Sequence, residues 1–144
     1  MQPTPDDVRP APGAHPGSGW VVVGLDNGGT CNNATVLSDS GEFLVDGLVE
    51  NESRVKDGPE VAVASLAASF ERILDLTGTP RAFVRAVGLD TPGPASADGV
   101  ISSKGATNFS QAAWRGFDFR RALESRIGLP VVYNNDGNAA ALYA

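Results

Sequence analysis

The fold of this 144-residue chain starts from the stretch WVVVGLDNGGT at residues 20–30. Residues 20–25 are apolar and rich in valine, which predicts a short buried strand. Residues 26–30, Asp-Asn-Gly-Gly-Thr, are expected to form a tight turn, because two adjacent glycines let the backbone bend sharply. A buried strand that runs into such a turn can bring its backbone close to a bulky anion.

The turn at residues 26–30 carries groups that suit a nucleotide. Backbone amides at Gly28 and Gly29, with the Thr30 hydroxyl, can hold phosphate oxygens. Asp26 can hold Mg²⁺ or its waters, since hard cations prefer oxygen ligands. The same residues also suit an ordinary hairpin turn, because Asn-Gly and Gly-Gly are common there. The turn alone supports both interpretations equally.

The next part of the chain predicts an antiparallel start followed by a helix. Strands are expected at residues 33–38 and 42–50, and the short turns between them require antiparallel neighbours. A helix is expected at residues 57–76, with Asp57 and Glu60 as a capping box and Gly78 at its end. Its predicted buried face consists of Val63, Leu66, Phe70, Ile73 and Leu74.

The rest of the chain alternates between strands and helices. Residues 82–89 are nearly all apolar, which predicts a central strand covered on both faces. Residues 91–117 are expected to be loops around a small hairpin that turns at Asp98-Gly99. A second helix should begin at Asp118, with a buried face made of Phe119, Ala122, Leu123 and Ile127.

A fifth strand is expected at residues 131–133 and a helix from Asn138 onward. The order of these strands and helices along the chain predicts an α/β fold, with a mixed sheet that starts with three antiparallel strands and is flanked by helices.

Two further stretches offer polar groups for a substrate. Asp136 follows the strand at residues 131–133, and ligands of open α/β sheets bind at the carboxyl ends of strands. Such a carboxylate can orient a hydroxyl and accept its proton late in phosphoryl transfer. By itself, however, the motif favours a simple helix cap. Asn108 offers both a donor and an acceptor, which suits sugar hydroxyls. A loop of turn residues is, however, a strong alternative for any single residue of this stretch.

Together these motifs resemble the ROK family of sugar kinases and sugar-responsive repressors, within the actin-like ATPase superfamily. The family patterns D-x-G-G-T, G-x-x-x-P-G-P, Asn-hydrophobe with a later Trp, G-x-P-V and N-D-x-N-A-A-A-L occur here in the same order. They are matched by residues 26–30, residues 88–94, Asn108-Phe109 with Trp114, residues 128–131 and residues 135–142. The resemblance covers residues 20–144.

The resemblance implies a ribonuclease H-like domain and ATP-dependent phosphorylation of a hexose hydroxyl, as in glucokinases. Asp136 would be the base that takes a proton from the sugar. The sugar contacts would come from Asn108, Asn135 and Asp136, and the cofactor contacts from Gly28, Gly29 and Thr30 on ATP phosphates and from Asp26 near Mg²⁺.

Two positions depart from the family pattern. The residue after the Asp is commonly aliphatic in the family and is Asn27 here, and the Lys that usually follows the Thr is replaced by Cys31. Both departures bear on nucleotide binding. Cys31 is interpreted as a small buried filler, with a redox-sensitive thiol as the alternative.

The resemblance also implies how the chain divides. Residues 1–19 are Pro-rich and acidic and are expected to form a disordered leader. Residues 20–144 would be the N-terminal lobe, ending at the start of the catalytic helix. A second lobe with the adenosine pocket, further sugar contacts and a Cys/His zinc cluster would be absent. The chain alone is therefore expected to be inactive, and the full-length protein to be a homodimer.

Composition narrows the class of protein. The formal net charge of −6 argues against a nucleic acid partner, and a single cysteine excludes an internal disulfide. No apolar run suits a membrane span or a signal peptide, so a cytoplasmic protein without a membrane partner is expected.

Two alternative functions remain. A ROK-type transcriptional regulator would need a DNA-binding domain before the phosphate loop. The 19-residue, Pro-rich stretch before Trp20 is too short for such a domain and has the wrong charge. An actin-like ATPase without a sugar substrate would not need Asn108, Asn135 and Asp136.

Overall fold

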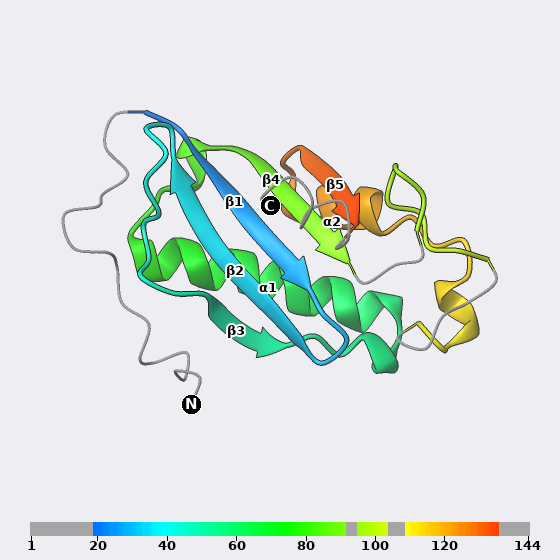
Figure 1. Cartoon of the computed structure of the whole chain (residues 1–144). Coiled ribbons are helices and arrows are strands. Elements are labelled where there is room, and N and C mark those ends of the chain that lie inside the picture. The colour runs from blue at the N-terminus through cyan, green and yellow to red at the C-terminus, as the bar shows by residue number, and fades with distance from the viewer. Residues whose placement is uncertain (1–18, 92–94, 104–108, 136–144) are drawn as a thin grey trace.

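The computed structural model describes residues 19–91, 95–103 and 109–135. Its elements, shown in Figure 1, are β1 (Val21–Asn27), β2 (Cys31–Ser38), β3 (Val49–Glu52), η2 (Val55–Asp57), α1 (Pro59–Thr77), η3 (Arg81–Phe83), β4 (Val84–Thr91), η4 (Ala112–Trp114), α2 (Phe119–Ile127) and β5 (Val131–Asn135). The predicted leader, apart from Gly19, and the predicted helix from Asn138 lie outside the described residues. None of the helices in the described ranges is both long and apolar enough to cross a membrane.

The strands form one five-stranded sheet in the order β3-β2-β1-β4-β5. The β1–β2 and β2–β3 pairs are antiparallel, while the β1–β4 and β4–β5 pairs are parallel. Short turns can join only antiparallel neighbours, and the parallel pairs need the longer crossovers that contain α1 and α2. The mixed sheet and its antiparallel start are therefore confirmed.

Both helices pack on the same face of the sheet, where the core lies (Figure 1). Alternate residues of β1 are buried against them, namely Val21, Val23 and Leu25. The predicted buried face of α1 is confirmed, since its members Val63, Leu66, Phe70, Ile73 and Leu74 are all buried. The opposite face of the sheet is open, and Val132 on β5 is 64% exposed there.

The third strand differs from its prediction in position and length. The third strand occupies Val49–Glu52 instead of residues 42–50, and Phe43 makes just an isolated bridge with Leu37. Leu44 and Val45 are consecutive and both buried. Two buried neighbours cannot follow the strict alternation of a regular strand, so this segment packs as an irregular connection.

Strands β1 and β4 also differ from what the sequence predicted. β1 runs on through Asp26 and Asn27, which pair with β2, so the tight turn is confined to residues 28–30. The expectation that residues 82–89 are covered on both faces is wrong, because Arg85 and Gly88 are exposed on the open side.

The helix starts differ in how they are capped. The predicted capping box of Asp57 with Glu60 does not form; α1 begins after Gly58, and Asp57 instead pairs with Arg54 at 3.0 Å. Gly78 ends α1 with a left-handed φ of 65°, as predicted. At α2 the predicted cap is present, because the Arg121 amide donates to Asp118 Oδ1 at 3.0 Å.

Two phenylalanines test where the core lies. Phe70 is fully buried between α1 and the sheet, whereas Phe43 is 58% exposed. Phe70→Ala should lower the free energy of unfolding by about 3–5 kcal/mol, because it leaves a cavity in a packed core. Phe43→Ala is the matched control and should change it by less than about 1 kcal/mol. Urea unfolding of the chain followed by tryptophan fluorescence checks both, and equal losses would contradict the assignment of the core.

Candidate functional site

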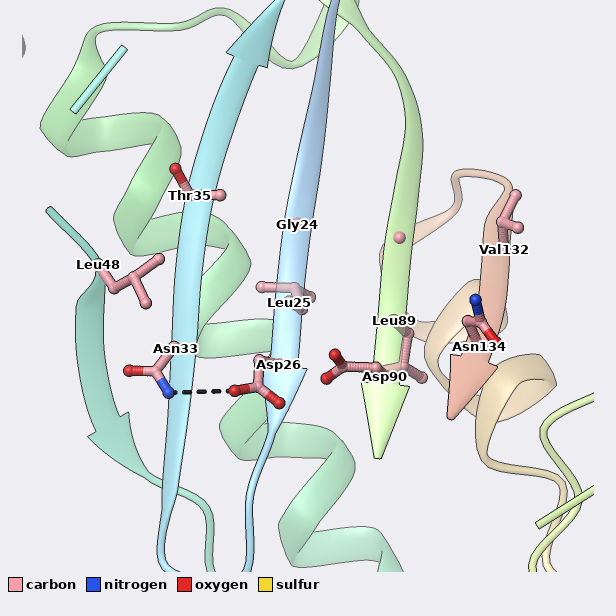
Figure 2. Close-up of a pocket in the computed structure, with 11 residues that line it drawn as sticks. Gly24, Leu25, Asp26, Asn33, Thr35, Leu48, Leu89, Asp90, Val132 and Asn134 are labelled. Carbon is pink, nitrogen blue, oxygen red and sulfur yellow. Dashed lines mark hydrogen bonds between the residues drawn. The ribbon is translucent and has the colours of Figure 1, made fainter. Parts of the chain in front are cut away.

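A row of polar side chains crosses the open face where the strands end. Register pairs join Asn33 to Asp26, Asp26 to Asp90, and Asp90 to Asn134, across β2, β1, β4 and β5. Figure 2 shows these four side chains at one level of the sheet, with Asp90 reaching toward Asp26. The row lies at the carboxyl edge of the parallel strands, where ligands of open α/β sheets bind.

The pocket beside this row has a floor of bare backbone. Gly24 and Gly88 are register partners on β1 and β4, and both line the pocket. A Cβ atom at Gly88 would meet nothing within 4 Å, so the surface is hollow at that point. Thr35, Leu48 and Val132 add apolar walls to a volume of about 320 Å³. A mostly apolar hollow with polar groups at one end suits a small polar ligand.

The two carboxylates of the row make it electronegative. Asp26 Oδ2 accepts a hydrogen bond from Asn33 Nδ2 at 3.3 Å. Asp26 and Asp90 lie opposite each other on neighbouring strands, an arrangement that is unfavourable for like charges unless a cation or a donor lies near them. Their hard oxygens fit Mg²⁺. Among the described residues no third acidic, His or Cys side chain completes a metal-binding group.

The glycine turn lies at the end of β1, one residue beyond Asn27. The Gly28 amide donates to the Cys31 carbonyl at 2.8 Å, and a Cβ atom at Gly28 would lie 2.7 Å from that oxygen. The position therefore requires glycine. On the other side, the Ser53 amide donates to the Thr30 carbonyl at 2.9 Å. Within the described ranges the amides of Gly29 and Thr30 have no backbone acceptor, which leaves them available to a phosphate.

The two departures from the family pattern, Asn27 and Cys31, lie on opposite faces of the sheet. Asn27 is fully buried on the helix side of the sheet, so its side chain faces away from the pocket that Asp26 lines. Cys31 is exposed, and the expectation of a small buried filler is wrong. It begins β2 in alternation with Asn33 and Thr35, which places it on the open side next to the turn.

The residues predicted to bind the sugar lie at the edge of what the structure describes. Asn108 and Asp136 are outside the described residues. Asn135 is the last residue of β5, where its backbone pairs with Thr91, one position beyond the polar row. The strand that leads to Asp136 therefore ends at the same edge as Asp26.

The segment after Asn108 is firmly anchored. Phe109 and Trp114 are fully buried, with ring centroids 4.6 Å apart. Trp114 Nε1 donates to the Val55 carbonyl at 2.8 Å, and Gln111 Nε2 donates to the Lys56 carbonyl at 2.7 Å. Trp114 and Gln111 thus hold this segment against η2, which follows β3 in the chain.

Sequence reasoning missed three members of the polar row: Asn33, Asp90 and Asn134. Asp90 stands inside the stretch 88–94 that was singled out, but its neighbours there are small turn residues. A charged residue at the end of an apolar strand was the available signal. Its meaning depends on the β1–β4 pairing, which local sequence patterns do not contain.

Comparisons with known proteins show which sequences and folds this chain is similar to. The glucokinase of Halalkalibacterium halodurans is 32% identical over 124 residues, which cover 85% of this chain and 35% of that protein. The crystal structure of a ROK hexokinase from Thermus thermophilus matches with a TM-score of 0.70 and 38% identity over 85% of this chain and 37% of that one. A ROK family glucokinase from Streptomyces griseus, in complex with glucose and AMPPNP, matches with a TM-score of 0.65 and 29% identity over 84% of this chain and 35% of that one.

Residues 22–143 match the model of the ROK family. The chain therefore belongs to the ROK family, and its domain has the predicted actin-like ATPase fold. It spans about a third of the length of the curated relatives it matches.

Two glycines of the site test the geometry of the turn. Gly28→Ala should lower the free energy of unfolding by about 1–3 kcal/mol, because the new methyl group would collide with the Cys31 carbonyl. Gly88→Ala is the matched control; its methyl group would enter open space, and the change should be neutral or stabilising by up to about 1 kcal/mol. Urea unfolding of both variants measures the difference, and an equal response at the two positions would argue against a tight turn.

Proposed function

We propose that the protein, as a member of the ROK family, phosphorylates a hexose hydroxyl with ATP, as a glucokinase does, and that this chain supplies the N-terminal part of the site. The carrying observation is the edge of the sheet, where Asp26 and the glycine turn at the end of β1 lie at the same edge as the end of β5, the strand that leads to Asp136, with β4 between them. The relatives named as glucokinases and the glucose and AMPPNP complex of one of them support this proposal.

The nucleotide side of the site is proposed to be the turn. Amides at Gly29 and Thr30 and the Thr30 hydroxyl would hold phosphate oxygens, and the absence of a Cβ at Gly28 keeps the turn tight. Asp26 would hold Mg²⁺ or its waters. When bound, Mg²⁺ neutralises charge on the transferring phosphoryl group.

The sugar side is proposed to consist of Asn108, Asn135 and Asp136. Amide groups donate to and accept from ring hydroxyls, which fixes the sugar. Asp136 would accept the proton of the attacking hydroxyl. Phosphoryl transfer asks little of a base, because the hydroxyl loses its proton late in a loose transition state.

Further parts of the proposal concern the whole protein. A second lobe would complete the adenosine pocket, because closure of two lobes aligns the reactants and excludes water. The chain alone would then be inactive. The family resemblance also supports a homodimer and a zinc cluster in the second lobe as parts of the proposal. A cytoplasmic location completes it and rests on the sequence pattern.

The assigned base is tested by Asp136→Asn in the full-length protein. The substitution should lower kcat for hexose phosphorylation by about 10²–10⁴-fold, because the amide cannot accept the proton. Asp75→Asn, on the exposed side of α1, is the matched control and should leave kcat unchanged. A coupled assay over a panel of hexoses measures both variants. An ATP hydrolysis rate that does not change with any hexose would instead support an actin-like ATPase.

The exposed thiol of Cys31 reports on the phosphate loop. With Mg²⁺ and AMPPNP at ten times Kd, its reaction with a disulfide reagent should slow about tenfold in the full-length protein, because a bound nucleotide covers the turn. A Cys31→Ser/Ala68→Cys variant, which moves the thiol to exposed α1, provides the matched control and should show no protection. Unchanged reactivity of Cys31 in the presence of nucleotide would place the phosphates elsewhere.

A further inference from the structure

The glycine turn rests on a buried pair of amides. Asn27 and Asn32 are the last register pair of β1 and β2, and both side chains are fully buried. Asn27 Nδ2 donates to Asn32 Oδ1 at 2.8 Å. Because these two residues flank residues 28–31, their bond closes the hairpin directly at the base of the turn.

The hydrogen bonds continue from this pair into α1 and β3. Asn32 Nδ2 donates to Ser65 Oγ at 3.3 Å, and Asn51 Nδ2 donates to the same oxygen at 3.1 Å. Ser65 Oγ in turn donates to the Glu52 carbonyl, and Ser69 Oγ donates to Asn51 Oδ1. We refer to Asn27, Asn32, Asn51, Ser65 and Ser69 as the amide chain; it links the ends of three strands to one helix.

Stability alone does not account for these amides. Asn27 Oδ1 and the nearby Ser53 Oγ are fully buried and have no hydrogen-bond partner among the described residues. A buried polar atom without a partner is unfavourable, and an aliphatic pair in place of Asn27 and Asn32 would avoid that cost. Hydrogen bonds, however, fix both distance and angle, which apolar contacts do not. The amide chain therefore holds the two strand ends in one orientation.

That orientation sets where the turn presents its amides. Gly28 is bonded to Cys31 across the turn, and Thr30 is bonded to Ser53 at the end of β3. Ser53 follows Glu52, whose carbonyl accepts from Ser65 of the amide chain. Both sides of the turn are thus tied to the same helix, and the amides of Gly29 and Thr30 lie between them.

We propose that Asn27 and Asn32 are positioning residues of the nucleotide site: their bond, anchored on Ser65 of α1, holds the Gly28–Gly29–Thr30 turn in the shape that receives ATP phosphates. This inference rests on the proposed function. Neither side chain touches the nucleotide, because both face the helix side of the sheet. Their effect reaches it through the backbone of the turn.

The test uses Asn27→Leu, Asn32→Leu and the double variant in the full-length protein. Each single variant should raise KM for MgATP by about three- to tenfold, because the turn loses the bond that orients it, while KM for the sugar stays unchanged. The single variants should also be less stable, since one buried amide is left without its partner. In the double variant both amides are gone, so thermal stability should recover while KM for MgATP stays raised.

Controls separate positioning from general destabilisation. Thr79→Val removes a buried hydroxyl that is bonded to Thr77 at the far end of α1. It should lower the melting temperature and leave both KM values unchanged. Ser65→Ala breaks the link to α1 without altering the hairpin and should raise KM for MgATP, which keeps the test open if a leucine variant fails to fold.

Two measurements that do not need activity separate this inference from the proposed function. Binding of Mg·AMPPNP by calorimetry should weaken in the double variant. Without ligand, hydrogen exchange at the Gly28 and Ser53 amides, which are bonded to the carbonyls of Cys31 and Thr30, should be faster in the double variant than in the wild-type protein. Absence of AMPPNP binding in the wild-type protein would overturn the proposed function. Wild-type binding together with unchanged affinity and unchanged exchange in the double variant would overturn the positioning role alone.

Discussion

The parallel pairing of β1 with β4 is the constraint on which the site depends. It sets Gly24 beside Gly88 and Asp26 beside Asp90, so that a bare floor and a pair of carboxylates form from strands far apart in the chain. The pairing of β4 with β5 then brings the end of β5 to the same edge. A slip of one residue would turn the Asp26 side chain toward the helices and the buried Leu25 side chain toward the open face, because alternate residues of a strand face opposite sides. The buried valines of β1 prevent such a slip.

Much of the fold could be predicted because its signals are local. The antiparallel start follows from short turns, and the buried face of α1 follows from helical spacing. The Asp118 cap could also be predicted, since it depends only on one side chain and the first turn of the helix that follows it. The third strand was misplaced because Val49–Glu52 is polar in sequence. Its Asn51 is held by hydrogen bonds to Ser65, which hydrophobic patterns cannot show.

The candidate site was predictable in part for the same reason. The glycine turn and Asp26 are visible as a motif, and the structure adds why Gly28 cannot be another residue. Asp90 was not singled out, because only the strand register reveals its partner. Neighbouring residues of β1 also lie on opposite faces of the sheet: Asp26 faces the pocket, while Asn27 faces the helices. A departure from the family pattern at Asn27 therefore concerns the support beneath the turn and leaves the lining of the pocket unchanged.

The bond from Trp114 to the Val55 carbonyl has a consequence for how this domain can diverge or be engineered. It joins two segments separated by 59 positions, one after Asn108 and one at the start of the α1 region. A loop transplanted from a relative would bring its own indole but not the matching backbone of η2. Grafts that move both segments together should keep the loop in place, and single-loop grafts should not. The two segments therefore have to change together, although they lie far apart in the sequence.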